Sequence, residues 1–553
     1  MLCLHILPVY SEKSSEPESQ IGSVRLLRHQ FETWEAFQDP NVDVIFNVTM
    51  TGDGKSLAGY LPTFMQGKHV TAAYPTNELV KDQRRGLEGY EQRLQKPLLR
   101  CETMYGARIT ELMRQTDTKV RLEQVRKLLV NNGIVLTNPD LVHLIMSHQY
   151  GWDYLRKELP TTVGAYFDYF LFDEFHVFGV PQVVSVMNML GYLDVTYRDK
   201  SADRKKFVFL SATPSRLLDT LLERSGLRSR KIEGYYCSSE QDGYRRILQG
   251  CDLTLHEISQ EQTTEQWVQE HLDEIRDFFK QHKGSKGAIL VNSVATARRL
   301  VALLKEQLET PYSISIGENT GLTDPAKRLD SFKKDILVGT STVDIGIDFR
   351  INYLIFEAYE TGSFLQRFGR LGRHDEFTVY QAHGLVPRFV LERFTQKYEA
   401  EGEIERKAFN EVVREVFPTE QEFEQYAKLW GVVQAARVLE ELRGQSRMDA
   451  NQEFSEALSV EYDRLYGSPE KPAMERAIKK FYRLKKNFPA ILAELSSFRG
   501  LSPLSCGVWD TDDHLQTYDL FFLLANTEFE VLDEEVFMQE VSRRGLEERD
   551  FKH

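Results

Sequence analysis

Residues 49–56, with the sequence TMTGDGKS, combine glycine, lysine and hydroxyl side chains in a spacing that suits a phosphate group. Gly52 and Gly54 let the backbone approach an anion closely, Lys55 adds a positive charge, and the Ser56 hydroxyl suits Mg²⁺. An apolar run leads into the loop, and the residues after Ser56 can begin a helix. Backbone N–H groups at a helix N-terminus attract negative charge. The stretch therefore predicts a strand, a phosphate-binding loop and a helix.

One position of this loop departs from the full phosphate-loop pattern, because Thr49 stands where that pattern has glycine. The shorter core TGDGKS is intact, and we expect Thr51 and Asp53 to contribute to the nucleotide site together with the two glycines. The alternative is an ordinary glycine-rich turn with a lysine that follows by chance. The polar residues further along the chain favour a nucleotide.

A pair of carboxylates closes a second apolar run. Residues 166–172 are strongly β-prone and end in Asp173 and Glu174. An open α/β sheet places its chemistry at the carboxyl ends of its strands. Asp173 can hold Mg²⁺, and Glu174 can orient and deprotonate an attacking water. A surface Asp-Glu pair alone carries little meaning, but a pair at the end of an apolar strand indicates hydrolysis.

Hydroxyl and amide side chains follow several other expected strands, at the sheet edge where a phosphodiester backbone could bind. Each such turn, taken singly, is better explained as a helix cap. The residues we expect to contact nucleic acid are Pro75, Thr76, Thr137, Asn138, Ser293 and Thr340. The residues we expect to relay the nucleotide state are His176, Ser211 and Thr213.

Three arginines recur at three-residue spacing after Gln366, namely Arg367, Arg370 and Arg373. On a helix this spacing places them along one face. A solvated basic face is the alternative interpretation. Two intervening glycines and little acidic pairing favour a cluster that faces phosphate.

Composition limits the class of protein. The 553 residues predict roughly three to four domains. A net charge of −14 argues against indiscriminate nucleic-acid binding, although a local basic groove remains compatible with it. Five cysteines without CxxC spacing argue against a disulfide framework and a zinc site, and for the cytoplasm. No apolar stretch reaches membrane-spanning length, so we expect no membrane partner.

The ordered set of motifs resembles the superfamily 2 helicases of DExH type. The motifs run from Gln30 through TGDGKS, YPTNELVKDQ, TNPD, DEFH, SAT and TSTVDIGID to QRFGRLGR. This resemblance covers roughly residues 21–373 and implies an α/β fold: two tandem RecA-like domains with parallel sheets, plus a mainly helical C-terminal accessory region. We expect the domains at residues 1–235, 236–386 and 387–553.

The resemblance also implies ATP and Mg²⁺ in the cleft between the two RecA-like domains. Lys55, Ser56, Asp173 and Glu174 would form the hydrolytic half-site. Arg370 and Arg373 would be the arginine fingers. The remaining implied nucleotide contacts are Gln30 at the adenine, Gln366 at the γ-phosphate, and Gly346 and Asp348 of the TSTVDIGID motif.

More narrowly, the chain resembles the stand-alone helicase subunit of type I CRISPR interference systems, subtype D. About twenty residues precede Ile21, too few for the histidine–aspartate nuclease domain of most relatives, so we expect the nuclease on a separate subunit. The implied partners are the CRISPR effector complex and single-stranded DNA, the non-target strand of an R-loop. Three alternatives stay open: a general DExH helicase for DNA or RNA, a nucleotide-gated RNA clamp or remodeller, and an interaction subunit with a degenerate ATPase.

Overall fold

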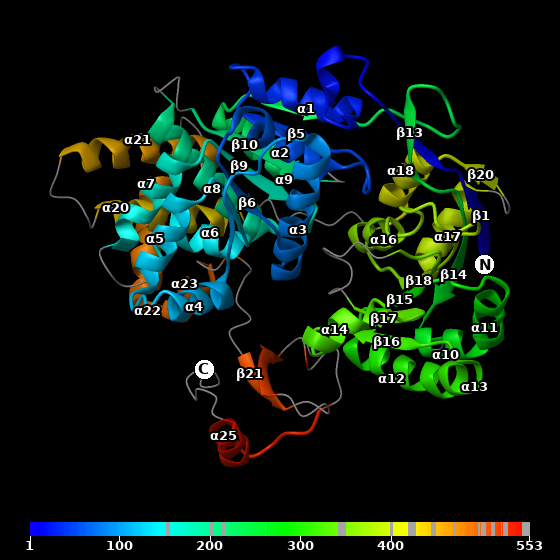
Figure 1. The fold of residues 1–553 in the computed structure, drawn as a ribbon. Helices are drawn as coiled ribbons and strands as arrows, with labels where there is room; N and C mark the ends of the chain where they lie inside the picture. Colours follow the sequence, from blue (N-terminus) through cyan, green and yellow to red (C-terminus); the bar gives the residue numbers. More distant parts are fainter. Residues whose placement is uncertain are drawn as a thin grey trace.

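Two α/β lobes, each built on a largely parallel sheet, make up most of the chain (Figure 1). The computed structural model describes residues 1–150, 155–198, 204–211, 216–259, 262–323, 325–340, 350–398, 402–417, 427–443, 449–467, 472–495, 498, 505–509, 515–520, 523 and 529–544. The two sheets and their helices confirm the predicted fold class of two RecA-like domains with a largely helical C-terminal region. Among the described helices, none is both long and apolar enough to cross a bilayer.

The first domain contains a seven-stranded parallel sheet. Its strands, in spatial order, are β11 (Ser229–Ile232), β5 (Val44–Asn47), β10 (Lys206–Leu210), β9 (Tyr169–Asp173), β6 (Val70–Ala73), β8 (Ile134–Thr137) and β7 (Cys101–Met104). Leu210 of β10 pairs with Asn47 on one side and with Asp173 on the other. This register puts the loop after β5 and the carboxylates after β9 level with each other, two strands apart.

Helices cover both faces of this sheet because the strand residues are apolar on both sides. Tyr169 and Leu171 pack into the core under α1–α3, whereas Phe170 and Phe172 pack into the core under α5–α9. The helices are α1 (Arg28–Gln38), α2 (Lys55–Gln66), α3 (Asn77–Leu94), α4 (Gly106–Gln115), α5 (Arg121–Asn131), α6 (Pro139–Met146), α7 (Leu155–Tyr166), α8 (Val180–Tyr197) and α9 (Arg216–Ser225).

The second domain contains an eight-stranded sheet. Its strands, in spatial order, are β16 (Ile316–Asn319), β17 (Ile336–Gly339), β15 (Gly287–Leu290), β18 (Tyr353–Glu357), β19 (Gln381–Pro387), β14 (Cys251–Ile258), β1 (Leu2–Ile6) and β20 (Gly402–Ile404). Its helices are α10 (Thr264–Glu270), α11 (Leu272–Gln281), α12 (Val294–Leu304), α13 (Thr310–Tyr312), α14 (Pro325–Ser331), α16 (Thr361–Phe368), α17 (Arg388–Lys397) and α18 (Arg406–Val416), with the π-helical segment η3 (Lys305–Glu309) after α12.

The first strand of the chain belongs to the second domain, which differs from the expected boundary of 1–235 for the first. Strand β1 pairs antiparallel with β14, Leu2 opposite Leu255, and parallel with β20. Leu2, Leu4 and Ile6 are buried in the second core. The alternating apolar residues of β1 fit either sheet, and the open edge of β14 is the one they cover.

The segment expected to be one accessory region divides between both domains. Within this segment α17 ends at Lys397 and strand β20 follows, with Gly402 paired to Leu4. Elements α17 and α18 pack into the second core. The later helices return to the first core. They are η4 (Ala427–Gly431), α20 (Val432–Arg443), α21 (Asp449–Tyr466), α22 (Met474–Asn487) and α23 (Pro489–Leu495).

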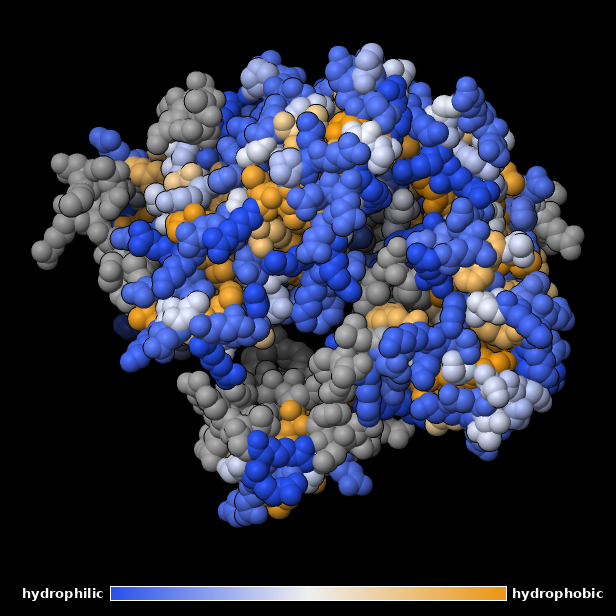
Figure 2. All heavy atoms as spheres, viewed as in Figure 1, coloured by the Kyte–Doolittle hydropathy of each residue, from blue (hydrophilic) through white to orange (hydrophobic). Residues whose placement is uncertain are grey.

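An antiparallel hairpin near the C-terminus, β21 (Ser505–Trp509) and β22 (Leu515–Asp519), lies below the two lobes in Figure 1 with α25 (Glu534–Arg543). Cys506 and Val508 of the hairpin pack against a small cluster of Val294, Leu322 and Leu523. The face drawn in Figure 2 is hollowed between the two lobes, above this hairpin. The hairpin therefore sits next to the start of α12, at the carboxyl edge of the second sheet.

A small three-stranded sheet joins the two domains. Its central strand β2 (Val9–Glu12) pairs antiparallel with β12 (Tyr236–Cys237) and with β13 (Tyr244–Leu248). We call it the bridging sheet. It receives one strand from the segment after β1 and two from the segment between β11 and β14. Both of these segments connect one domain to the other. The remaining short elements are η1 (Pro17–Ser19), β3 (Gln20–Ile21), β4 (Val24–Arg25) and η2 (Phe175–Val177).

Candidate active site

The phosphate loop (residues 49–56) lies between buried strand β5 and helix α2, as predicted. Gly52 and Gly54 have φ angles of 88° and 80°, which glycine adopts without the strain a side chain would cause. A methyl group at Gly54 would lie 2.7 Å from Gln30 Nε2. Helix α2 begins at Lys55, so the first-turn N–H groups face the loop. The loop therefore has the form of an anion cradle.

A buried polar network supports the loop from below, and sequence reasoning missed it. Asn47 Nδ2 contacts His29 Nδ1 at 3.0 Å, and Asn47 Oδ1 accepts from the Thr49 hydroxyl at 2.8 Å. His29 Nε2 lies 3.0 Å from the backbone oxygen of Asp53. Thr49, in the usual glycine position, thus holds the loop through its side chain. The signal in the sequence was a polar Asn47 at the end of an apolar strand.

Lys55 lies across its own loop. Its Nζ donates to the backbone oxygens of Thr49 at 2.8 Å and Met50 at 3.0 Å. Burial lowers the pKa of Lys55, and Arg373 lowers it further, against the opposing effect of Glu174, Asp173 and Asp53. Three carboxylates and a second cation therefore act on one buried lysine.

Gln30 contacts the loop backbone. Its Nε2 donates to the oxygen of Gly54 at 3.0 Å, and its Oε1 accepts from the N–H of Leu27 at 2.9 Å. The side chain is buried. In this arrangement Gln30 braces the turn into α2, and its contact with adenine stays a prediction.

Asp173 and Ser56 meet at the position expected for a metal. The Ser56 hydroxyl donates to Asp173 Oδ2 at 3.2 Å, while Asp173 Oδ1 accepts from the N–H of Glu174 at 2.8 Å. Burial, followed by the charge of Glu174, raises the pKa of Asp173 to about 7. Two hard oxygen donors side by side at the edge of a phosphate cradle fit Mg²⁺.

Glu174 follows Asp173 with a φ of 52°, in the left-handed region that residues with side chains seldom adopt. The backbone therefore turns sharply after β9, and η2 begins one residue later. Such backbone conformations concentrate at functional sites, where the surrounding structure holds them in place. Asp173 is buried and Glu174 is partly exposed, so the two neighbouring carboxylates have different surroundings.

The arginine motif differs from its prediction. Helix α16 ends at Phe368, and Gly372, with a φ of 82°, turns the chain beyond it. Arg367 is buried and donates to the backbone oxygens of Glu357 and Val291 at 2.8 and 3.4 Å. It therefore holds α16 to the second sheet, and the predicted single helical face of three arginines is wrong.

Arg373 instead lies against the phosphate loop of the other domain. A methyl group at Gly52 would lie 3.8 Å from Arg373 Cγ, and one at Gly369 would lie 3.4 Å from Thr51 Cβ. Arg373 Nε donates to the oxygen of Gly369 at 2.8 Å. Arg370 is buried in the same turn, and Gln366 precedes it on α16. The site is thus divided between the domains.

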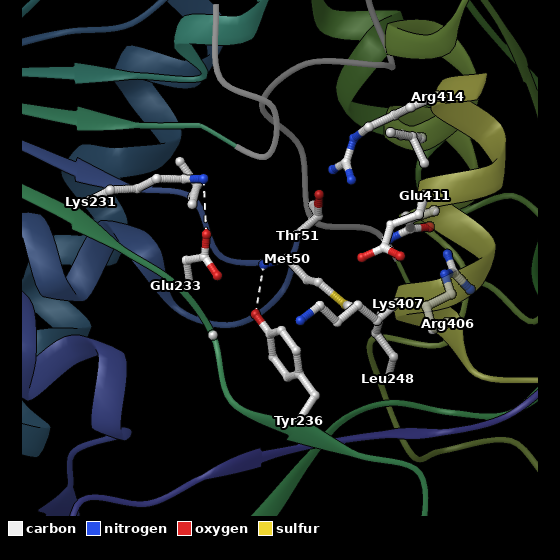
Figure 3. Close-up of a pocket in the computed structure, with 15 residues that line it drawn as sticks. Met50, Thr51, Lys231, Glu233, Tyr236, Leu248, Arg406, Lys407, Glu411 and Arg414 are labelled. Atoms are coloured by element: carbon white, nitrogen blue, oxygen red, sulfur yellow. Dashed lines mark hydrogen bonds and ion pairs between the residues drawn. The ribbon is translucent and has the colours of Figure 1, made fainter. Parts of the chain in front are cut away.

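A cavity of about 340 Å³ adjoins this divided site (Figure 3). Met50 and Thr51 of the phosphate loop line one wall. Arg406 and Arg414 of α18 line the opposite wall. The cavity therefore lies between the two domains and beside the loop.

The residues expected to contact nucleic acid fall into two groups. Thr76, Asn138 and Ser293 are partly exposed helix caps at strand ends, accepting from Leu79, Leu141 and Thr296 N–H groups. Asn138 also donates to Asn77 Oδ1 at 3.1 Å, which joins two neighbouring loops. These three keep their expected position at the sheet edges.

The other group is buried. The Thr137 hydroxyl donates to the backbone oxygen of Met104 at 2.7 Å and is fully buried, so its assignment to the nucleic-acid surface is wrong. Pro75 and Thr340 are buried as well, which corrects the same expectation for their side chains. Residues at the ends of buried apolar strands are buried with the strands. The pattern of apolar and polar residues in the sequence does not predict how far that burial extends.

Several expected residues lie at or beyond the limits of the described chain. Ser211 is buried and its N–H donates to the oxygen of Asn47 at 3.1 Å, between the phosphate loop and β9. His176 lies in η2, and its side chain is outside the described part. Thr213, Gly346 and Asp348 lie outside the described residues.

Comparisons with known proteins agree with this geometry. The family model for DEAD/DEAH box helicases matches residues 28–221, and the model for the C-terminal part of the CRISPR-associated nuclease/helicase Cas3 matches residues 283–376. No curated protein matches the chain in sequence. Each matched range falls on one of the two RecA-like domains.

Three solved structures are similar in fold. The DUF1998 helicase MrfA bound to DNA gives a TM-score of 0.64 at 16% identity, covering 94% of this chain and 67% of that one. Mycobacterium smegmatis helicase Lhr bound to ssDNA and AMP-PNP gives a TM-score of 0.51 at 17% identity, covering 88% of this chain and 57% of that one. Cas3 of T. fusca with AMPPNP gives a TM-score of 0.52 at 12% identity, covering 77% of this chain and 55% of that one. The chain thus spans little more than half of the Lhr and Cas3 chains.

The divided site lies on two RecA-like domains, and the match to the DEAD/DEAH box helicase family falls on the first of them. The chain therefore has the fold and the site of an ATP-dependent helicase. Residues 283–376 of the second domain are similar to the C-terminal part of Cas3, and between 77% and 94% of the chain shares its fold with MrfA, Lhr and Cas3.

Proposed function

We propose that this chain is an ATP-driven motor that moves along single-stranded DNA. The observation that carries the proposal is Arg373 of the second domain placed against Gly52 of the phosphate loop. An arginine supplied across a cleft stabilises transition-state charge and is worth about 10³–10⁵ in rate. Hydrolysis then requires the domains to close, and closure changes the spacing between the helix caps that grip the strand.

The chain's own residues divide the work. Loop N–H groups and Lys55 hold the β- and γ-phosphates, Glu174 orients the attacking water and accepts its proton, and Arg373 and Arg370 face the departing phosphate. Mg²⁺, held by Ser56 and Asp173, would neutralise charge on the phosphate oxygens. Gln366 stays a proposed γ-phosphate contact, supported by its place on α16 directly before the arginine turn.

We place this motor in type I CRISPR interference, in the cytoplasm. Support comes from the match of residues 283–376 to the C-terminal part of Cas3 and from the shared fold. A guide-RNA effector complex leaves the non-target strand single-stranded, and a motor that binds through backbone contacts needs such a free strand to load. In this proposal a separate subunit carries the nuclease step.

The charge of the chain supports loading by a partner. A net charge of −14 weakens unassisted capture of duplex DNA, because sequence-independent binding depends on phosphate neutralisation by lysine and arginine. An effector complex that presents an open strand removes this barrier.

A general DNA helicase outside CRISPR is the second candidate. The observation in its favour is the MrfA fold, which covers 94% of this chain at a higher TM-score than Cas3. The two candidates differ in what opens the duplex for the motor.

The experiment compares ATPase and unwinding on plain duplex with the same duplex carrying an effector-bound R-loop, at physiological salt. We expect activity mainly on the R-loop substrate. Equal activity on both would reject recruitment and leave the general helicase. Metal-dependent degradation of single-stranded DNA by the purified chain, lost on mutation of this chain, would reject the separate nuclease.

A further inference from the structure

The phosphate loop is held from a third side, by the linker between the domains. Tyr236 lies in β12 of the bridging sheet, and its partner across the strand pair is Ser11 of β2. In Figure 1, β13 of this sheet lies directly above α18 of the second domain and to the right of α1 of the first. A contact from this sheet to the phosphate loop therefore joins the nucleotide site to the segments that connect both domains.

Tyr236 makes that contact with both its hydroxyl and its ring. Its hydroxyl accepts from the N–H of Met50 at 2.8 Å and donates to Asp53 Oδ2 at 2.8 Å. Figure 3 shows the ring directed at the start of the loop, with the Met50 bond drawn. The ring and the Met50 side chain pack on a small core of Val9, Ile247 and Leu248. Backbone and side chains of the loop are thus tied to the same sheet.

Asp53 explains why a hydroxyl is needed here. Its carboxylate is fully buried, with His29 Nε2 at 3.4 Å from Oδ2, and among the described residues its Oδ1 has no hydrogen-bond partner. Burial and the charge of Asp53 raise the pKa of Tyr236, so the hydroxyl keeps the proton that it donates. A buried carboxylate that loses a donor is costly. Tyr236 therefore fixes the position of the Asp53 carboxylate.

We infer that Tyr236 is a positioning residue that fixes residues 50–53 of the phosphate loop on the bridging sheet and so pre-forms the cradle for the β- and γ-phosphates. The inference rests on the proposed nucleotide function. Tyr236 touches no reacting group, so its loss weakens phosphate binding and leaves the chemical step intact.

The test compares two tyrosine-to-phenylalanine variants at neighbouring positions. Tyr236→Phe keeps the ring packed on Met50 and removes only the hydroxyl. Tyr235→Phe is the matched control, because its exposed ring keeps the Arg28 guanidinium 3.7 Å above it. The measurements are the Kd of a fluorescent ATP analogue, and KM and kcat for ATP.

We expect Tyr236→Phe to raise Kd and KM about tenfold, as for the loss of a hydrogen bond to a charged group, with kcat changed less than about twofold. Tyr235→Phe should match the wild type. A fall in kcat with unchanged KM, or an unchanged Kd, would overturn the inference. If the wild type itself fails to bind the analogue, the proposed function fails instead.

Two further measurements separate positioning from general destabilisation. In the nucleotide-free protein, amide hydrogen exchange at Met50 should quicken in Tyr236→Phe while the sheet amides of β9 stay protected. In an Asp53→Asn background, Tyr236→Phe should raise Kd less than it does in the wild type, because the buried charge is gone. Unchanged exchange at Met50, or additive effects in the double variant, would contradict the inference.

Discussion

The Ser56 hydroxyl donates to Asp173 Oδ2 over 3.2 Å, which joins the helix after the phosphate loop to the strand that ends in the carboxylate pair. The bond spans two strands of the first sheet and depends on β10, which lies between them and pairs in register with both. It marks the point where the Ser56 hydroxyl oxygen and the Asp173 carboxylate would hold Mg²⁺.

Mg²⁺ binding should depend on pH through Asp173. Burial and Glu174 raise its pKa to about 7, so the protonated form gains population as the pH falls below that value. A protonated carboxyl binds Mg²⁺ poorly. We expect the apparent Mg²⁺ affinity, measured by titration with a fluorescent ATP analogue, to fall from pH about 8 to pH about 6. Asp173→Asn should bind weakly at every pH, and a flat wild-type profile would contradict the assignment.

Glu174→Gln should separate ATP binding from hydrolysis. The amide keeps the shape of the side chain and the turn after Asp173 but cannot accept the proton of the attacking water. Turnover should fall by about 10²–10⁴, with the Kd for ATP nearly unchanged. Asp168→Asn, the same chemical change immediately before β9 begins, is the control. Wild-type turnover in Glu174→Gln would remove Glu174 from the mechanism.

Two arginines six residues apart should behave in opposite ways. Arg373→Ala should fold normally, bind ATP and lose turnover by about 10³ or more, because Arg373 faces the phosphate loop. Arg367→Ala should instead lower the free energy of unfolding by about 3 kcal/mol, because two backbone carbonyls lose a buried charged donor. Thermal melting and single-turnover kinetics distinguish them. If Arg373→Ala acts mainly on DNA affinity, Arg373 belongs to the strand-binding surface.

The C-terminal helices should stabilise the first domain. Leu439 of α20 is fully buried in the first core, so Leu439→Ala should lower the free energy of unfolding by about 2–5 kcal/mol. Val460 of α21 is 70% exposed, so Val460→Ala should change the free energy of unfolding by less than about 0.5 kcal/mol. Urea denaturation followed by fluorescence measures both. Equal effects would mean that α20 is an independent accessory unit.

The sequence predicted the parts of the site that local chemistry defines. The phosphate loop, the carboxylate pair and the arginine motif each carry their residue types within a few positions, next to a strand or helix with a clear pattern. The meeting of the phosphate loop and the carboxylate pair follows from the rule that parallel strands present their carboxyl ends at one edge. Arg373 lies on the other domain, so its position against Gly52 depends on how the two domains pack.

Long-range pairing was beyond the sequence. The alternating residues of β1 fit either sheet, and nothing near them indicates that β14, about 250 residues away, has the free edge. The return of α20 to the first core is similarly non-local. Tyr236 carries no motif, because its role depends on a strand pair that brings the linker under the loop.

The most direct test of the account measures ATP turnover with single-stranded DNA, single-stranded RNA or no nucleic acid. The account predicts clear stimulation by single-stranded DNA, weaker or no stimulation by RNA, and loss of turnover in Lys55→Ala under all three conditions. Turnover that is equal in the three conditions, or that persists in Lys55→Ala, would contradict a DNA-driven motor built on this divided site.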